Sequence, residues 1–427
     1  MRKFYFLPKV MALLAAVLIM QPLLQAEDFK VPKGHFNISD SSIDEGHTGV
    51  VVFATKSGFV VVWSDDHNIK MQFFKKTGKK VGSPKIIHQN TVHKIYSLEG
   101  VWMGKLGAIV WAQDTGLGIS IWGKILNAKG GVQVAPTNPL THGFGSSTRK
   151  FGSPAVSWNG KNLLLAFMET DQGNDIYCGK FTSKLARRGT FKKVKSGKDG
   201  TPHSLGALPH KNGWILSWTE EKSAGQSLPI DSKGSSANPW FSVRKQSNAR
   251  GKSYRGWSSP PSVNPFTFWG RAWQQENGQI GWLPIGWLPI GAVDSERTAK
   301  PWAYYYFSSN ARGQYTGSAG NAITWLDPQD VRNGRIVIGP SGYAHWIHFW
   351  RSISTVFPNL WILFYVDGQT WIPTDFGTCM CNIVLYACYG HYAPRDLSLI
   401  GYSGHDQSRE GVSQVYGTFV KMPPIPY

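Results

Sequence analysis

Acidic residues recur at one position of a repeated pattern in the N-terminal half of the chain. Each comes shortly after an aromatic residue that ends an apolar segment, and together they are Asp65, Asp66, Asp114, Glu169, Asp171, Glu220 and Glu221. Two carboxylates held about 5–10 Å apart can hydrolyse a glycosidic bond. The candidate catalytic residues are therefore Asp114, Glu169, Asp171 and Glu220. The alternative is that acidic side chains simply suit polar turns.

A second group of residues could bind a sugar. Aromatic side chains and arginines that fall outside the repeat gather in a Pro- and Gly-rich stretch, where residues 281–290 repeat Gly-Trp-Leu-Pro-Ile. A flat ring covers the C–H groups of a sugar while its polar edge stays hydrogen-bonded. The candidate ligand-binding residues of this expected loop region are Arg250, Tyr254, Arg255, Trp257, Trp269, Trp273, Trp282 and Trp287. The alternative is that these residues only pack within the fold, or that the stretch arose by a local sequence duplication, without binding a ligand.

Four possible metal ligands lie within 13 residues near the C-terminus: Cys379, Cys381, Cys388 and His391. Their spacing does not match the Cys-x2-Cys pairs of zinc sites. In an exported chain, a disulfide from Cys388 to Cys379 or Cys381, or plain buried thiols, is favoured over zinc. Cys178 fits a small buried strand position. We expect no metal and no other cofactor.

The chain is strongly basic, with 45 Lys and Arg against 26 Asp and Glu and a net charge of +19. Without residues 1–26, which hold three of the basic residues, 42 remain against 26. A positive field of this size attracts acidic polymers such as sulfated or uronic-acid glycans, teichoic acids or phospholipid headgroups. Solvated charge at hairpin turns is the alternative. Nucleic acid is not expected, because no binding module is recognisable.

The elements that position these residues are predicted from an internal repeat. Closing aromatics at Trp63, Trp111, Phe167 and Trp218 are 48, 56 and 51 residues apart, and each is followed by a polar loop and an alternating strand. Ser-Asn-Ala-Arg-Gly occurs at 247–251 and again at 309–313, and turn glycines recur at 78, 130, 189, 251 and 313. Units of about 50 residues are typical of propeller blades.

We therefore predict an all-β fold, a single β-propeller of seven blades over residues 27–427, with six or eight blades as alternatives. The closing aromatics should be wedges between blades. Residues 49–53 are expected to complete the last blade. The repeat is hardest to follow over residues 255–395, where tryptophan is frequent and acid is rare.

The N-terminus is predicted to direct export. Met1, Arg2, Lys3 and Lys9 precede an apolar stretch over 10–20, and the small residue Ala26 follows. This is the layout of a signal peptide spanning 1–26, and an uncleaved anchor is the alternative. No later stretch reaches the roughly 18 apolar residues of a transmembrane helix. We expect a secreted or otherwise extracytoplasmic monomer.

The repeat itself resembles a known group of proteins. The pattern Gly-x-Val-Val-x-Trp, a polar loop and an alternating strand ending in Gly-Lys is similar to the secreted propeller-like repeat proteins of bacteria and protists, over about 49–220 and again at 396–421. Residues 247–254 also look like the Asp-box turn of sialidase-type propellers, with Ala249 where that family has Asp. The resemblance implies an architecture and not an activity.

These observations predict a binding or adhesion protein that recognises a glycan or another acidic surface polymer. The first alternative is a glycoside hydrolase or lyase that uses carboxylates of the post-aromatic loops. The second is a structural scaffold that binds other proteins.

Overall fold

The computed structural model describes residues 34–39, 49–171 and 175–194 with their side chains. It also describes strands between residues 195 and 421, with side chains at 205–207, 214, 216, 397–404 and 414–420. The described residues form strands and turns and no helix. In this part of the chain no helix is long and apolar enough to cross a membrane. The predicted signal peptide, residues 1–26, lies outside the described residues.

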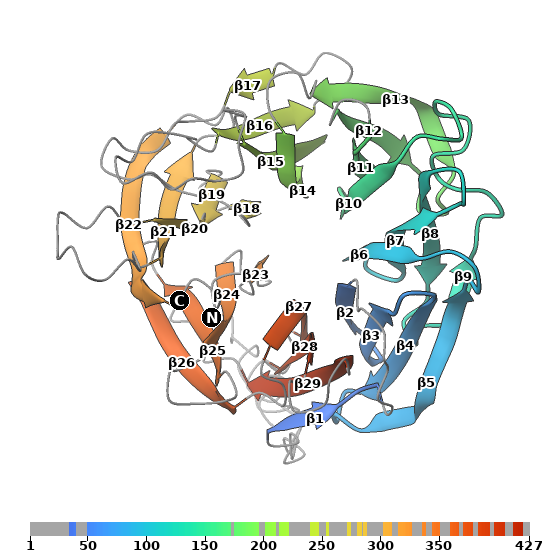
Figure 1. Ribbon diagram of the computed structural model, residues 1–427. Helices are drawn as coiled ribbons and strands as arrows, with labels where there is room; N and C mark the ends of the chain where they lie inside the picture. The colour runs from blue at the N-terminus through green and yellow to red at the C-terminus, as the bar shows by residue number, and fades with distance from the viewer. Residues whose placement is uncertain are drawn as a thin grey trace, which may run out of the picture.

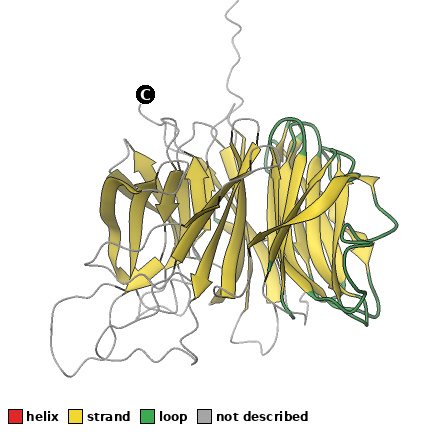
Figure 2. Cartoon of the chain, turned by 90° about the horizontal axis from the view of Figure 1, so that it is seen from above, coloured by secondary structure: helices red, strands yellow, loops and turns green. Residues whose placement is uncertain are grey.

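The described strands form antiparallel sheets arranged in a ring (Figure 1). The chain is therefore an all-β propeller, as the repeat predicts. The described strands fall into seven sheets, which we number as blades 1–7. Seen from the side, the strands of each blade run between the two faces of the ring (Figure 2).

The first three blades are four-stranded meanders, and in each one the first strand is innermost and the last is at the outer edge. Blade 1 consists of β2 (Gly49–Thr55), β3 (Gly58–Ser64), β4 (Asn68–Lys75) and β5 (Lys80–Gln89). Blade 2 consists of β6 (Ile95–Trp102), β7 (Gly107–Asp114), β8 (Ile119–Leu126) and β9 (Val132–Val134). Blade 3 consists of β10 (Phe151–Trp158), β11 (Leu163–Glu169), β12 (Ile176–Phe181) and β13 (Arg187–Lys195).

The next three blades are described mainly by their backbone. Blade 4 consists of β14 (Thr201–His210), β15 (Gly213–Glu221), β16 (Trp240–Gln246) and β17 (Ser253–Arg255). Blade 5 consists of β18 (Arg271–Gln274), β19 (Ile280–Leu283), β20 (Ile285–Trp287), β21 (Trp302–Ser309) and β22 (Tyr315–Leu326). Blade 6 consists of β23 (Arg335–Ile338), β24 (Ala344–Trp350), β25 (Asn359–Val366) and β26 (Thr370–Thr378).

The core lies between neighbouring blades. Trp63 packs in one cluster with Leu399 of blade 7, and Trp111 packs with Val60 of blade 1. Phe167 packs with Val110 of blade 2. Both tryptophans are fully buried, so each closing aromatic fills the space between its own blade and the preceding one. The prediction that these residues are wedges is confirmed for Trp63, Trp111 and Phe167.

Hairpin turns join the strands within a blade. Gly78 and Gly130 end turns with φ of 74° and 83°, a backbone region in which a Cβ is strained. At Gly130 an added Cβ would also meet Met71, because its Cε would lie 1.8 Å away. The turn glycines expected from the repeat are thus required by conformation at these positions.

The two ends of the chain close the ring in blade 7. Its strands are β27 (Ile383–Tyr392), β28 (Leu397–His405) and β29 (Ser413–Lys421), and β1 (His35–Asn37) is added at the outer edge. His35 Nδ1 and the Tyr402 hydroxyl are hydrogen-bonded at 2.8 Å, and Phe36 stacks on Phe419. Ile38, which follows β1, is fully buried in the same cluster as Trp63.

The expectation that residues 49–53 complete the last blade is wrong. They belong to β2, which pairs with β3 through a tight hairpin in which Thr55 lies opposite Gly58. Since β2 is buried along nearly all its length, it suits the inner position of blade 1 and not an outer edge. The closing strand is the shorter segment β1, upstream of it.

Ring closure by β1 leads to a stability prediction. Ile38→Ala should lower the free energy of unfolding by about 2–5 kcal/mol, because it leaves a cavity in a core shared by blades 7 and 1. Urea unfolding followed by tryptophan fluorescence measures the change. The control is Val92→Ala, which shortens a side chain that is 73% exposed. Equal midpoints for the two variants would contradict a closing role for this segment.

Candidate functional site

The post-aromatic acidic residues lie where β3, β7, β11 and β15 end, at one face of the ring. The residue two positions after the aromatic is Asp65, Gln113 or Glu169 in blades 1–3, and these side chains are 0%, 6% and 2% exposed. Side chains alternate along a strand, so each points, like its aromatic, toward the preceding blade. The sequence pattern therefore marks a buried polar position at the end of the wedge and not a solvated loop.

Most of the acidic residues in blades 1 and 2 are engaged locally. Asp65 forms an ion pair with Lys70 at 2.7 Å and accepts the backbone N–H of Asn68 at 2.6 Å, which fixes the β3–β4 turn. Asp66 forms an exposed ion pair with Lys94 at 3.0 Å. Asp114 accepts the N–H of Gly116 at 2.7 Å in the turn after β7. These carboxylates stabilise turns and blade contacts.

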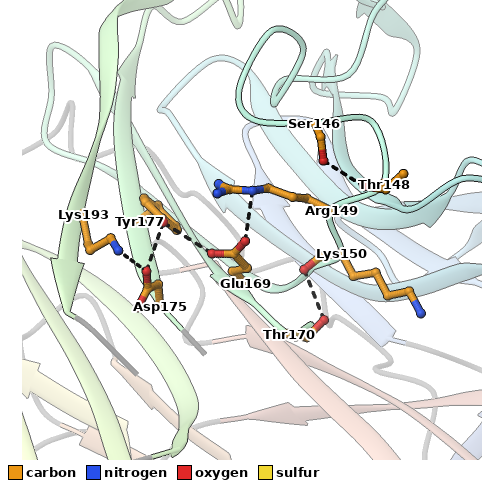
Figure 3. A network of polar contacts seen from close by, with 9 residues as sticks. All are labelled: Ser146, Thr148, Arg149, Lys150, Glu169, Thr170, Asp175, Tyr177 and Lys193. Carbon is orange, nitrogen blue, oxygen red and sulfur yellow. Dashed lines mark hydrogen bonds and ion pairs between the residues drawn. The ribbon is translucent and has the colours of Figure 1, made fainter. Parts of the chain in front are cut away.

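Blade 3 holds a network of polar side chains at this face (Figure 3). Glu169 forms an ion pair with Arg149 at 3.1 Å, and Asp175 forms one with Lys193. The hydroxyl of Tyr177 lies 3.3 Å from Glu169 Oε2 and 3.1 Å from Asp175 Oδ2, so a single phenol links the two carboxylates. Glu169 and Asp175 are both buried, while the cations extend toward solvent.

The charges of this network are balanced. Each carboxylate has its own cation, and Tyr177 has one proton to donate. Burial raises the pKa of the Tyr177 hydroxyl, and the hydrogen bond to Asp175 raises it further, so the phenol is neutral. The hydrogen bond to Asp175 also raises the pKa of Lys193. The arrangement holds two cations in fixed positions at the rim of the ring.

Arg149 is the most constrained of these cations. Its Nε contacts Glu169, its guanidinium lies 5.9 Å from the centre of the Phe144 ring, and a Cβ on Gly145 would come within 2.6 Å of its Cδ. The loop is tied to the end of β11 because Lys150 O accepts the N–H of Thr170 at 2.8 Å. The Nη atoms donate no hydrogen bond to any residue that the structure describes, and 27% of the side chain is exposed.

The same loop carries hydroxyl groups. Ser146 Oγ and Thr148 Oγ1 are 2.8 Å apart, and both residues are exposed beside Arg149 (Figure 3). Hydroxyls and a guanidinium edge are groups that recognise an oxyanion attached to a polar ligand. We call Ser146, Thr148, Arg149, Glu169 and Tyr177 the Arg149 site.

The chain matches no protein-family model and no curated protein sequence. The WD40 domain of Toxoplasma gondii coronin is a similar solved structure, with a TM-score of 0.53, 10% identity, and coverage of 92% of this chain and 86% of that one. This likeness supports the propeller fold alone.

Two further solved structures align with lower scores. The α-L-arabinanase of Penicillium chrysogenum complexed with arabinobiose has a TM-score of 0.48 and 11% identity, and the alignment covers 92% of this chain and 99% of that one. The α-L-arabinofuranosidase of Fusarium graminearum with an iminosugar inhibitor has a TM-score of 0.46 and 10% identity, with 93% and 99% covered.

Glu169 is predicted from the sequence, whereas its partners Arg149 and Tyr177 are not. Arg149 lies in an irregular loop, and Asp175 directly precedes β12. Tyr177 is the cross-strand partner of Phe167, the closing aromatic, and Lys70 and Trp122 occupy the equivalent places in blades 1 and 2. That register was the one signal that could have led from Glu169 to Tyr177.

The other predicted site residues are described less fully. Asp171 is exposed. Glu220 lies on β15, where the structure describes its backbone. Trp273, Trp282 and Trp287 lie on β18, β19 and β20 of blade 5. Tyr254 and Arg255 lie on β17 of blade 4. The expected loop region is therefore partly strand, which corrects that prediction, while Arg250, Trp257 and Trp269 lie outside the described residues.

The predicted cysteine and histidine group also falls partly on a described strand and partly outside the described residues. Cys388 and His391 lie on β27, and Cys379 and Cys381 fall outside the described residues. Cys178 is buried between blades 3 and 4, as expected for a small strand residue. Within the described ranges no three His, Cys, Asp or Glu side chains are grouped as metal ligands would be.

Gln113 forms a different network between blades 1 and 2. Its Oε1 accepts the indole N–H of Trp111 at 3.1 Å and lies 2.8 Å from His88 Nε2, which is therefore the protonated ring nitrogen. Lys124 Nζ donates to Ile87 O at 2.5 Å. Burial lowers the pKa of His88, and the neighbouring Lys124 charge lowers it further, although the hydrogen bond to Gln113 acts in the opposite direction.

This network makes the stability dependent on pH. Because the pKa of His88 in the folded protein lies below its usual 6.5, the unfolded chain takes up a proton first as the pH falls. The stability is complete above about pH 6.5 and decreases as the pH falls toward the folded pKa. His88→Gln should flatten the dependence of the thermal midpoint between about pH 7 and pH 5. His142→Gln, at an exposed histidine, is the control, and an unchanged slope in His88→Gln would refute the assignment.

Proposed function

We propose that this protein is an exported binding protein whose ring face recognises a glycan that carries anionic groups. The observation that supports this most directly is the Arg149 site. A buried carboxylate holds Nε of Arg149, and the Nη edge is not used by any described residue. A guanidinium fixed in this way is suited to bind a carboxylate or sulfate through two parallel hydrogen bonds.

The surroundings of Arg149 favour a sugar as the carrier of that anion. Ser146 and Thr148 offer hydroxyls that donate and accept hydrogen bonds, as sugar hydroxyls do. The net positive charge of the chain would raise the local concentration of an acidic polymer and its rate of association. The predicted signal peptide would place the protein where such polymers occur.

Substitution of Arg149 tests this function. Arg149→Ala should weaken binding to immobilised heparin, which carries sulfates, or to polygalacturonate, which carries carboxylates, by about 10-fold or more at low salt. Arg149→Lys should restore part of the affinity, since it keeps the charge and loses the two-pronged geometry. Dissociation constants from biolayer interferometry give the measurement.

The matched control is Lys105→Ala, which removes one exposed positive charge from the β6–β7 hairpin. It should change the affinity by less than about 2-fold, because a distant surface charge contributes little. If Arg149→Ala and Lys105→Ala behave alike, the charge of the whole protein and not the Arg149 site accounts for binding.

Hydrolysis of a glycan is the second candidate function. The observation that favours it is the carboxylate pair of Glu169 and Asp175, which are linked by one phenol and therefore lie at a separation suited to glycoside hydrolysis. Against it, both carboxylates are buried and each is already paired with a cation. A glycosidase needs one carboxylic acid that donates a proton to the leaving group.

The two functions are separated by an assay for reducing ends. We expect the purified protein to retain heparin or polygalacturonate and to release no reducing sugar from them, or from linear arabinan. Release of reducing ends that is lost in both Glu169→Gln and Asp175→Asn, with the fold intact by circular dichroism, would replace the binding function by the hydrolytic one. Asp114→Asn is the control, because that carboxylate caps a turn.

A further inference from the structure

The outer strand of blade 3 carries an unusual concentration of positive charge. β13 has Arg or Lys at five of its nine positions, in the sequence RRGTFKKVK. Among the described strands it pairs with β12 alone, and it forms the outer edge of its sheet (Figure 1). Its residues 187, 188, 192 and 193 are exposed, whereas Phe191 and Val194 are buried and anchor the strand.

These cations are not equivalent. Arg187 donates to His142 O at 3.2 Å and lies 5.1 Å from the centre of the Phe191 ring. Lys193 is paired with Asp175. Arg188 and Lys192, in contrast, make no ion pair with any residue that the structure describes. The strand thus holds two cations in place through its own contacts and presents two others to solvent.

One of the two solvent-facing cations of β13 has a like charge opposite it in the sheet. Arg188 lies directly opposite Lys180 of β12, whose Nζ is 6.0 Å from the centre of the Trp214 ring. Like charges at facing positions of an antiparallel pair are destabilising. Stability of the blade therefore does not account for Arg188.

Protection of a sheet edge also does not account for the number of cations on β13. Lysines on an outer strand prevent pairing with another chain, and very short outer strands need none. The outer strand of blade 2, β9, has three residues and no charge. The outer strand of blade 1, β5, is longer than β13 with ten residues, yet it has two lysines, Lys80 and Lys85. β13 has more than twice as many cations on a shorter edge.

We propose that β13 is a binding track for a linear anionic polysaccharide, which leads outward from the Arg149 site along the edge of blade 3. This inference rests on the proposed function and extends it from one anionic group to a polymer. Lys193 of β13 connects to that site, because it pairs with Asp175, which is hydrogen-bonded to Tyr177. From residue 187 to residue 193 an extended strand spans about 20 Å, which is the length of several sugar units.

The double variant Arg188→Gln/Lys192→Gln tests the track. It should elute from immobilised heparin at lower salt than the wild type, and the slope of log affinity against log salt concentration should fall by about 1–2, since two ionic contacts are lost. The matched control is Lys85→Gln/Lys105→Gln, which removes two exposed charges elsewhere and should leave the slope within experimental error. Short sulfated oligosaccharides should bind both variants alike, because they reach only the Arg149 site.

The outcomes separate this inference from the proposed function. If the wild type binds neither heparin nor polygalacturonate at low salt, both are wrong. If Arg149→Ala weakens binding while the β13 variant elutes with its control, the Arg149 site stands and the track is overturned. Aggregation of the β13 variant with unchanged elution would assign these charges to edge protection. Equal affinity of the wild type for heparin and for duplex DNA of the same charge would also overturn a polysaccharide track.

Discussion

The burial of aromatic wedges between neighbouring sheets is the interaction on which this structure depends. An isolated four-stranded sheet exposes two apolar faces, and in a ring each face is covered by the next sheet. Trp63, Trp111 and Phe167 are buried in that interface in three successive blades. The residue two positions after each aromatic is polar and ends the apolar part of the interface. Polar contacts at the ring face therefore begin directly after the buried aromatic residue.

This geometry explains why acidic residues can be repeated without acting together. Asp65, Gln113 and Glu169 occupy one position in three blades, yet each finds different partners because the loops above them differ. Blade 3 is distinguished by the loop that brings Arg149 to Glu169 and by Tyr177, whose hydroxyl contacts the same carboxylate (Figure 3). The proposed ligand-binding site therefore lies where blade 3 differs from the two blades before it.

The architecture could be predicted from the sequence because its signals are local and periodic. In each unit the closing aromatic, the alternating strand and the turn glycine follow one another closely in the sequence, and the aromatics recur after 48, 56 and 51 residues. The closing strand was misplaced because β1 has three residues and pairs across the whole length of the chain. Arg149, Asp175 and Tyr177 were missed for a related reason, since their meeting depends on strand register and loop path. In blade 5, Gly and Pro between the tryptophans hid the alternation of β18, β19 and β20.

The closure of the ring by β1 constrains the order in which the protein can fold. His35 is paired with Thr418, so one of the first described residues depends on one of the last. Contacts of such long sequence separation form late, because loop closure is entropically costly and slow. Blades 1–6 can each form from a continuous segment as the chain is made, whereas blade 7 must wait for the complete polypeptide. A chain truncated before residue 413 would lack the strand against which its own N-terminal segment docks, and both faces of that gap would expose apolar surface to chaperones and proteases.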